Sequence, residues 1–264
     1  IAFTSILDKF KDKVCVASFY PRVFEDISQV EEIYPDPSIE MIANKLIYSG
    51  FDNIKYVEPY FNNFLKGEMH LIEAYHECYN LRCDGLYHNC DFSDEQIHYY
   101  SRFIEELGDF ILVQFTGSDK TNDLVMSRNL NFKTAQEIIN IICHDLKLKV
   151  IDVNDGQSIY ENTFVPRKPV SYREYLLMMR YCKSFISIDS CLNHMSAYKN
   201  RPVAGVCLWR DKDYSKLFSY PQNSNIMSDL PLKMSFKTQI IVDTFLTKQQ
   251  KEKLKVLEVT ANMV

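Results

Sequence analysis

Short apolar runs alternate with segments of helical periodicity along most of this 264-residue chain. The runs KVCVASFY, DFILVQF and PVAGVCLW are rich in valine and aromatic residues, which is typical of buried strands. Segments between them, such as SDEQIHYYSRFIEELG and KTAQEIINIICHDL, place apolar residues on one side of a helix. The alternation predicts an α/β fold with parallel sheets, because parallel strands need a crossover connection that is usually a helix.

The alternation runs through two series that meet near Gly108. Ser93 is a favourable N-cap for the helix before this point, and Gly108 is a favourable stop. We therefore predict two doubly wound, Rossmann-like units, residues 1–108 and 109–235, followed by a helical tail at 236–264. The first series opens with helical sequence, so we expect its leading strand and loop to be missing from this chain.

The composition excludes several classes of function. The formal net charge is −5, so the chain has no overall positive field for nucleic acid or an anionic membrane. No apolar run approaches the roughly 20 residues of a membrane span. The eight cysteines are scattered, and several lie inside apolar patterns as small hydrophobes rather than in a disulfide framework. We expect a reducing, cytoplasmic location.

Polar residues follow one buried strand in the stretch FISIDSCLNHMSAYKNRPVAGVCLW. Ligands of open parallel sheets bind at the carboxyl ends of strands, and Asp189 lies at such an end. We predict a helix over residues 190–198. Its first amides, at Cys191 and Leu192, are candidates to hold a phosphate, and the Ser190 hydroxyl is a candidate further donor.

Asn193 and His194 fall in the first turn of the same predicted helix, where they can face the same crevice. Two simpler interpretations compete, because Asp189 is a favoured N-cap residue and His194 can be a hydrogen-bonded core histidine. A thiol nucleophile at Cys191 beside His194 lacks a third, orienting group. From these residues alone, a ligand site and a structural turn are equally open.

The segment SYREYLLMMRYCKSFISIDSCLNHMSAYKNRPVAGVCLW resembles the carboxyl-terminal signature of glycosyltransferase family 9, the heptosyltransferases. That signature is a helix, a strand that ends in Asp-Ser/Thr-Gly, two further residues and His, a helix of small residues, and Pro-Val before the next strand. The residues in register here are Asp189, Ser190, His194, Ala197, Pro202 and Val203. Cys191 departs from the family's glycine, and its Cβ narrows the room for a diphosphate.

The resemblance extends upstream. DFILVQFTGSDKTNDLVMSRNLNFKTAQEIINII resembles the first strand, the small-residue loop and the helix of the family's donor domain. Thr116, Gly117 and Ser118 match the loop that approaches the donor phosphates. Arg128 matches a family lysine before the helix, although a solvated loop charge explains it nearly as well. VIDVNDGQSIYE resembles the next strand, a glycine turn and a Glu-bearing helix start.

The resemblance implies a GT-B architecture, in which residues 1–108 lie on the acceptor side of a cleft and residues 109–235 bind a nucleotide sugar. It implies inverting, metal-independent transfer of a hexose or heptose to a hydroxyl group on a glycan, a lipid-linked sugar or another acceptor. The nucleotide sugar is then a co-substrate, and no separate cofactor is expected. The family's catalytic base is an Asp in a loop that would lie upstream of Ile1, so we assign no catalytic residue.

Two other functions stay open on the sequence. One is a non-catalytic nucleotide- or sugar-binding module that keeps the donor half of the fold. The other is a GT-B sugar-nucleotide epimerase, which would need acid–base carboxylates that we do not locate in the sequence.

One segment, HECYNLRCDGLYHNCD, carries five potential zinc ligands: His76, Cys78, Cys83, His88 and Cys90. Their spacing matches no zinc motif. His76 and Cys78 lie two residues apart on a predicted helix and therefore face different sides. We expect no metal at this segment, and we expect Trp209, at the end of a strand, to be a core residue.

Overall fold

The computed structural model describes residues 2–18, 21–25, 27–35, 38, 40, 44, 64, 66–89, 92–117, 129–153, 158–164, 172–229 and 235–247. Its elements are η1 (Ala2–Lys9), β1 (Val14–Ala17), η2 (Pro21–Val23), β2 (Val30–Tyr34), α2 (Leu71–Cys78), α3 (Asp94–Leu107), β3 (Phe110–Gln114), α4 (Phe132–His144), β4 (Lys149–Asp152), α5 (Tyr172–Tyr181), β5 (Ser184–Ile188), α6 (Cys191–Met195), β6 (Val206–Trp209), α7 (Lys212–Phe218) and β7 (Ser224–Met227).

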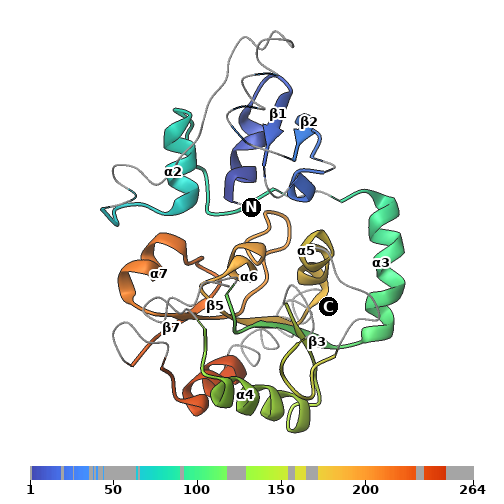
Figure 1. Ribbon diagram of the computed structural model, residues 1–264, viewed down its shortest axis with the longest axis vertical. Helices are drawn as coiled ribbons and strands as arrows, with labels where there is room; N and C mark the ends of the chain where they lie inside the picture. The colour runs from blue at the N-terminus through green and yellow to red at the C-terminus, as the bar shows by residue number, and fades with distance from the viewer. Residues whose placement is uncertain are drawn as a thin grey trace, which may run out of the picture.

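The larger sheet has five parallel strands in the order β4-β3-β5-β6-β7. Figure 1 labels three of them, β3, β5 and β7, in the lower part of the molecule. The chain passes from β3 through α4 to β4 on one side and then returns to the other side, where β5, β6 and β7 follow in sequence. The strand order reverses between β3 and β5, which makes this pair the switch point of a doubly wound sheet. The predicted α/β class with parallel strands is confirmed.

Helices cover both faces of this sheet, as a parallel sheet requires. Alternate residues of β3 enter different cores. Phe110 and Leu112 pack with residues of α3, α5 and α6, whereas Ile111 and Val113 pack with residues of α4 and of the helical segment 238–247. The sheet is therefore the middle of three layers, and α3 and the tail helix both contribute to its cores. The predicted unit boundaries themselves stay predictions.

Helix α3 begins and ends where its capping residues predict. The Ser93 hydroxyl accepts a hydrogen bond from the Gln96 amide at 3.3 Å. Gly108 ends the helix with φ at 67°, a conformation that costs glycine little because it has no Cβ. These two residues fix the point at which β3 begins.

The first series contains a smaller sheet, in which β1 and β2 run parallel. Strand β1 lies within the predicted KVCVASFY run. Strand β2 was not predicted, because Glu31 and Glu32 give its sequence a polar look and their side chains are exposed. The opening segment is a 3-10 helix, η1. Most of the predicted helix at 37–50 and the whole predicted strand at 53–60 lie outside the described residues.

Main-chain hydrogen bonds join the first series to the segment that follows α6. The His88 amide donates to the Ala197 carbonyl at 2.9 Å, and the Lys199 amide donates to the His88 carbonyl at 3.1 Å. A buried cluster extends this contact, with Ile72 of α2 in the same cluster as Ala197 and Tyr220. Figure 1 shows α2 lying over α7, in agreement with that packing.

The structure corrects the predicted helix over 190–198, because α6 ends at Met195. His88 pairs with the main chain of the next residues, so their carbonyl and amide groups are not available for helical bonding. Helix α7 and strand β7 were not predicted at all. The β7 sequence SNIM is short and half polar, which is typical of a strand at the edge of a sheet.

Within the part of the chain that the structure describes, no helix combines the length and apolar character needed to cross a bilayer. The predicted helical tail is described as far as residue 247.

Candidate nucleotide-sugar site

The switch point brings together the carboxyl ends of β3 and β5. Gln114, the last residue of β3, is in register with Ser187 of β5, so the turns that leave the two strands start side by side. Ligands of doubly wound sheets bind at this place. The predicted stretch that begins at Asp189 leaves β5 here, which puts it at the position expected of a donor site.

The Gln114 side chain bridges the two strand ends. Its Oε1 atom accepts a hydrogen bond from the Leu192 amide at 3.3 Å and contacts the Cys191 sulfur, also at 3.3 Å. The Leu192 amide is one of the two that we predicted to hold a phosphate, and in this structure Gln114 occupies it. Sequence analysis did not single out Gln114, although an amide that ends an otherwise apolar strand was a usable signal.

Asp189 and Ser190 form the turn between β5 and α6. Asp189 is buried, with 9% of its surface exposed. Ser190 holds the N-cap position, so the alternative in which Asp189 caps the helix is wrong. The Ser190 hydroxyl makes no capping bond, and its oxygen is buried without a hydrogen-bond partner among the described residues. A buried hydroxyl in that state has capacity for a ligand or a water.

The loop after β3 is described only at its two ends. Thr116 and Gly117 are partly exposed, and the Gly117 amide donates to the Asn129 side-chain oxygen at 2.7 Å. This contact closes the base of the loop. Ser118 and Arg128, the other two residues predicted for donor binding, lie outside the described residues.

The turn after β4 adds a carboxylate and an aromatic stack to the same edge of the sheet. The Ser158 hydroxyl donates to Asp152 Oδ2 at 2.8 Å. Burial, followed by the nearby Asp152 charge, raises the pKa of Tyr160. Phe132, the first residue of α4, stacks on Tyr160 with ring centroids 5.5 Å apart, and 52% of its surface is exposed. An exposed aromatic ring at this edge can receive a planar ligand.

Comparison with solved structures gives a strong match to one fold. The glycosyl transferase family 9 protein from Veillonella parvula aligns with 95% of this chain and 93% of its own, with a TM-score of 0.68 and 10% sequence identity. The fold is that of glycosyltransferase family 9. The E. coli ADP-heptose LPS heptosyltransferase II matches over 96% of this chain and 94% of its own, with a TM-score of 0.62 and 10% identity. The predicted GT-B architecture is confirmed.

Comparisons of sequence find no match for this chain, in contrast to the comparison of structure. No protein-family model matches the chain, and no curated protein matches it. The family 9 fold is therefore carried by a sequence that has diverged to 10% identity with these two structures.

Two residues of the family-like stretch bond to the end of α7 and to the segment that follows it. Asn193 is fully buried: its amide nitrogen donates to the Phe218 carbonyl at 2.8 Å, and its oxygen accepts from Asn223 at 3.0 Å. The prediction that Asn193 faces the crevice is wrong, because these bonds tie it to the last residue of α7 and to the segment that follows. His194 Nδ1 lies 2.8 Å from the Tyr220 hydroxyl on that same segment. A donor-binding role for His194 stays a prediction.

Among the described residues of the histidine- and cysteine-rich segment, no cluster of three or more potential metal ligands occurs. His76 Nδ1 bonds to the Ile72 carbonyl at 2.9 Å, and His88 Nε2 bonds to the Met195 carbonyl at 3.1 Å. In both histidines, one ring nitrogen is therefore hydrogen-bonded to a main-chain carbonyl. Cys90 lies outside the described residues.

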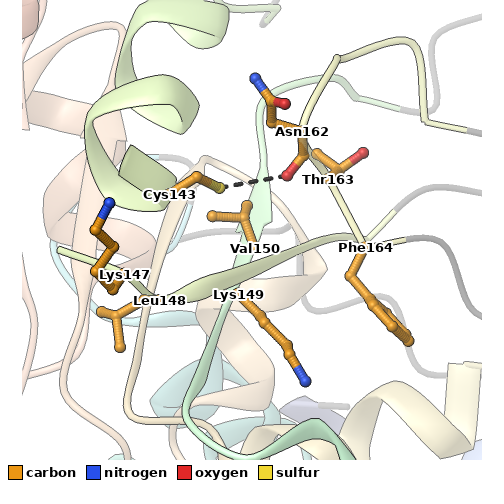
Figure 2. Close-up of a pocket in the computed structure, with 8 residues that line it drawn as sticks. All are labelled: Cys143, Lys147, Leu148, Lys149, Val150, Asn162, Thr163 and Phe164. Carbon is orange, nitrogen blue, oxygen red and sulfur yellow. Dashed lines mark hydrogen bonds between the residues drawn. The ribbon is translucent and has the colours of Figure 1, made fainter. Parts of the chain in front are cut away.

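A shallow hollow lies at the other edge of the larger sheet, where the strands begin, beside the start of β4 (Figure 2). Its lining includes Lys147 and Lys149, whose amines point in different directions in Figure 2. Lys149 donates to the Glu106 carbonyl at 3.2 Å, and Cys143 Sγ contacts the Asn162 carbonyl at 3.3 Å. The hollow has no group of converging polar atoms, so it is not our candidate site. Trp209 is fully buried, as predicted.

Proposed function

We propose that this protein is a glycosyltransferase that moves a sugar from a nucleotide-sugar donor to a hydroxyl acceptor. The observation that carries the proposal is the match, over nearly the whole length of both chains, to the fold of two family 9 proteins. One of them is named as an ADP-heptose heptosyltransferase acting on lipopolysaccharide. An ADP-sugar is therefore the first donor to test, and a glycan hydroxyl is the first acceptor.

The donor would lie across the switch point. Its diphosphate would contact the turn at Asp189–Leu192 and the loop that begins at Thr116, with Ser118 and Arg128 as further phosphate ligands. The exposed Phe132 ring, at the same edge of the sheet, is suited to stack on the nucleobase. Arg128 would neutralise part of the diphosphate charge through a forked contact.

The proposed reaction is an inverting displacement without a metal ion. Negative charge builds on the departing diphosphate, and main-chain amides, hydroxyl groups and a cation can stabilise it there. A general base must take the proton of the acceptor hydroxyl, and we assign that role to no residue of this chain. No separate cofactor enters the scheme, since the nucleotide sugar is a co-substrate.

A binding module without turnover is the second candidate. Two observations favour it: Gln114 already holds the Leu192 amide, and Cys191 stands where the resembling family has glycine. Both reduce the space and the donors available to a diphosphate. Turnover separates the two functions, because a module would bind the nucleotide sugar without releasing nucleoside diphosphate.

The deciding experiment has two stages. Thermal shift and calorimetry with ADP, UDP, GDP and dTDP, and with their sugar conjugates, identify the donor. Release of nucleoside diphosphate from the selected donor is then measured with and without EDTA, and the anomeric configuration of the product is assigned by NMR. Absence of binding to every nucleotide would refute the proposed function. Binding without release would favour the module, and loss of activity in EDTA would refute metal independence.

We predict that Gln114→Glu weakens nucleoside diphosphate binding by at least about tenfold. The variant places a carboxylate within a few ångströms of the proposed phosphate position, and the two negative charges repel each other. Calorimetry of the variant and the wild type with the selected diphosphate measures this change. Gln239→Glu adds the same charge on the exposed tail helix and is expected to leave affinity unchanged. Equal losses in both variants would show that net charge alone is responsible.

A further inference from the structure

Helix α2 is capped by a histidine side chain. The Nδ1 atom of His70 accepts a hydrogen bond from the Ile72 amide at 3.1 Å, and the Glu73 carboxylate accepts one from the His70 amide at 2.7 Å. The pair forms a capping box in which an imidazole takes the place of the usual hydroxyl or carboxylate. Only a ring nitrogen that carries no proton can accept this bond, so the cap exists only while His70 is neutral.

The same imidazole packs against the unit that carries the larger sheet. His70 and Tyr220 meet edge to face with ring centroids 4.9 Å apart, and His194 meets Tyr220 from α6 at 5.7 Å. Tyr220, which is 1% exposed, is thus held between α2 and α6. Phe64 contacts Phe218 at 5.7 Å and extends the contact. His70 is therefore both the cap of α2 and part of its docking surface.

We propose that the His70–Tyr220–His194 contact is an acid-sensitive latch: protonation of His70 removes the cap of α2 and releases this helix from the α7–β7 segment. The inference does not rest on the proposed transfer reaction. It rests on three features of the structure, which are an accepting ring nitrogen at a helix start, burial of that ring at 4% exposure, and its position between two packed segments.

Few charged groups face the latch. Three groups favour a protonated His70 and so oppose release: the Phe218 carbonyl, the Glu73 carboxylate and the Ser219 carbonyl. Tyr220 and His194 face His70 from the other side, and His88 lies beyond His194. His76 follows on α2 itself. A protonated His70 would be a charge shielded from solvent, and the positive end of the helix dipole would repel it. Burial is the largest effect, and it lowers the pKa of His70 to about 4.

The direction of the pH effect follows from this pKa. A released His70 takes up its proton near pH 6.5, whereas a docked one does so near pH 4, so docking is fully favoured above pH 6.5 and weakens as the pH falls toward 4. For this one group, the equilibrium for opening rises by roughly 30-fold between pH 8 and pH 5.

Hydrogen exchange of the α2 amides tests the latch directly. Protection factors of residues 71–78, corrected for the intrinsic effect of pH on exchange, are compared at pH 8 and pH 5 in the full chain. We expect the wild type to lose about 30-fold in protection more than His70→Asn loses, because asparagine is a strong N-cap that does not titrate. The control His98→Asn changes an exposed histidine on α3 and should behave as the wild type.

Two outcomes would overturn the latch. One is an equal loss of α2 protection in the wild type and His70→Asn, which would assign the pH effect to groups other than His70 or to global opening. The other is an NMR titration of the His70 ring in the wild type with a pKa of 6.5 or higher. The titration needs no variant, so the proposal stays testable even if His70→Asn fails to fold.

Discussion

Acidification from pH 8 to pH 5 is expected to lower the free energy of global unfolding by at least about 4 kcal/mol. His70 and His88 are 4% and 1% exposed. Burial lowers the pKa of His70 to about 4 and that of His88 to about 3. Both must stay neutral in the folded protein, whereas the unfolded chain takes up protons from about pH 6.5 downward. Each histidine contributes about 2 kcal/mol at pH 5, and His194, which is partly buried, acts in the same direction.

Urea unfolding at pH 8, 7, 6 and 5 measures this loss. The decrease should begin below about pH 6.5 and steepen toward pH 5, and His88→Gln should remove part of the slope. The exposed His98 gives the matched control, since His98→Asn should leave the slope intact. A free energy of unfolding that is constant from pH 8 to pH 5 would show that the buried histidines do not have lowered pKa values.

Asn193→Ala is expected to destabilise the protein by about 3–5 kcal/mol. The Asn193 side chain is 0% exposed and makes three contacts, to the Phe218 carbonyl, to Asn223 Nδ2, and to Cys207 Sγ at 3.1 Å. Truncation leaves a void, removes the Asn193 donor from the Phe218 carbonyl and removes the acceptor of Asn223 Nδ2. An unsatisfied buried polar group costs about 1–3 kcal/mol. The bonds hold α6 to the segment after α7, so both should loosen together.

Thermal and urea unfolding of Asn193→Ala against the wild type at pH 8 checks this value. Asn200→Ala is the matched control, because Asn200 is exposed and bonds only to the Tyr198 hydroxyl among the described contacts. It should change the free energy of unfolding by less than about 0.5 kcal/mol. If the two variants are equally stable, the Asn193 network is not structural and its orientation toward the crevice must be reconsidered.

The sequence predicted the larger sheet well because local and global signals agree there. The run at Phe110–Gln114 is apolar on both faces, as a strand between two helical layers must be, and Ser93 and Gly108 mark the helix before it. The prediction failed at the margins. Strand β7 is short and half polar because it is last in the sheet, and α6 stops early because of a pairing with His88, more than 100 residues away.

The site was predicted in position but not in detail. Asp189 follows a buried strand, so a parallel sheet alone places it at the ligand edge. Gln114 was missed because its importance depends on contacts with residues 77 and 78 positions later. The inward orientation of Asn193 could not be read from a helix of five residues, which is too short to show a periodic face. Ser118 and Arg128 keep their predicted roles untested.

The main-chain pairing of His88 with residues 197–199 has a mechanical consequence. It joins the amino-terminal part of the chain to the segment that directly continues α6 and the turn at Asp189. A rotation of the amino-terminal part that keeps these two hydrogen bonds would displace residues 197–199 and, through them, α6 and the turn at Asp189. Binding of a substrate to one part of the chain would then shift the position of the other part.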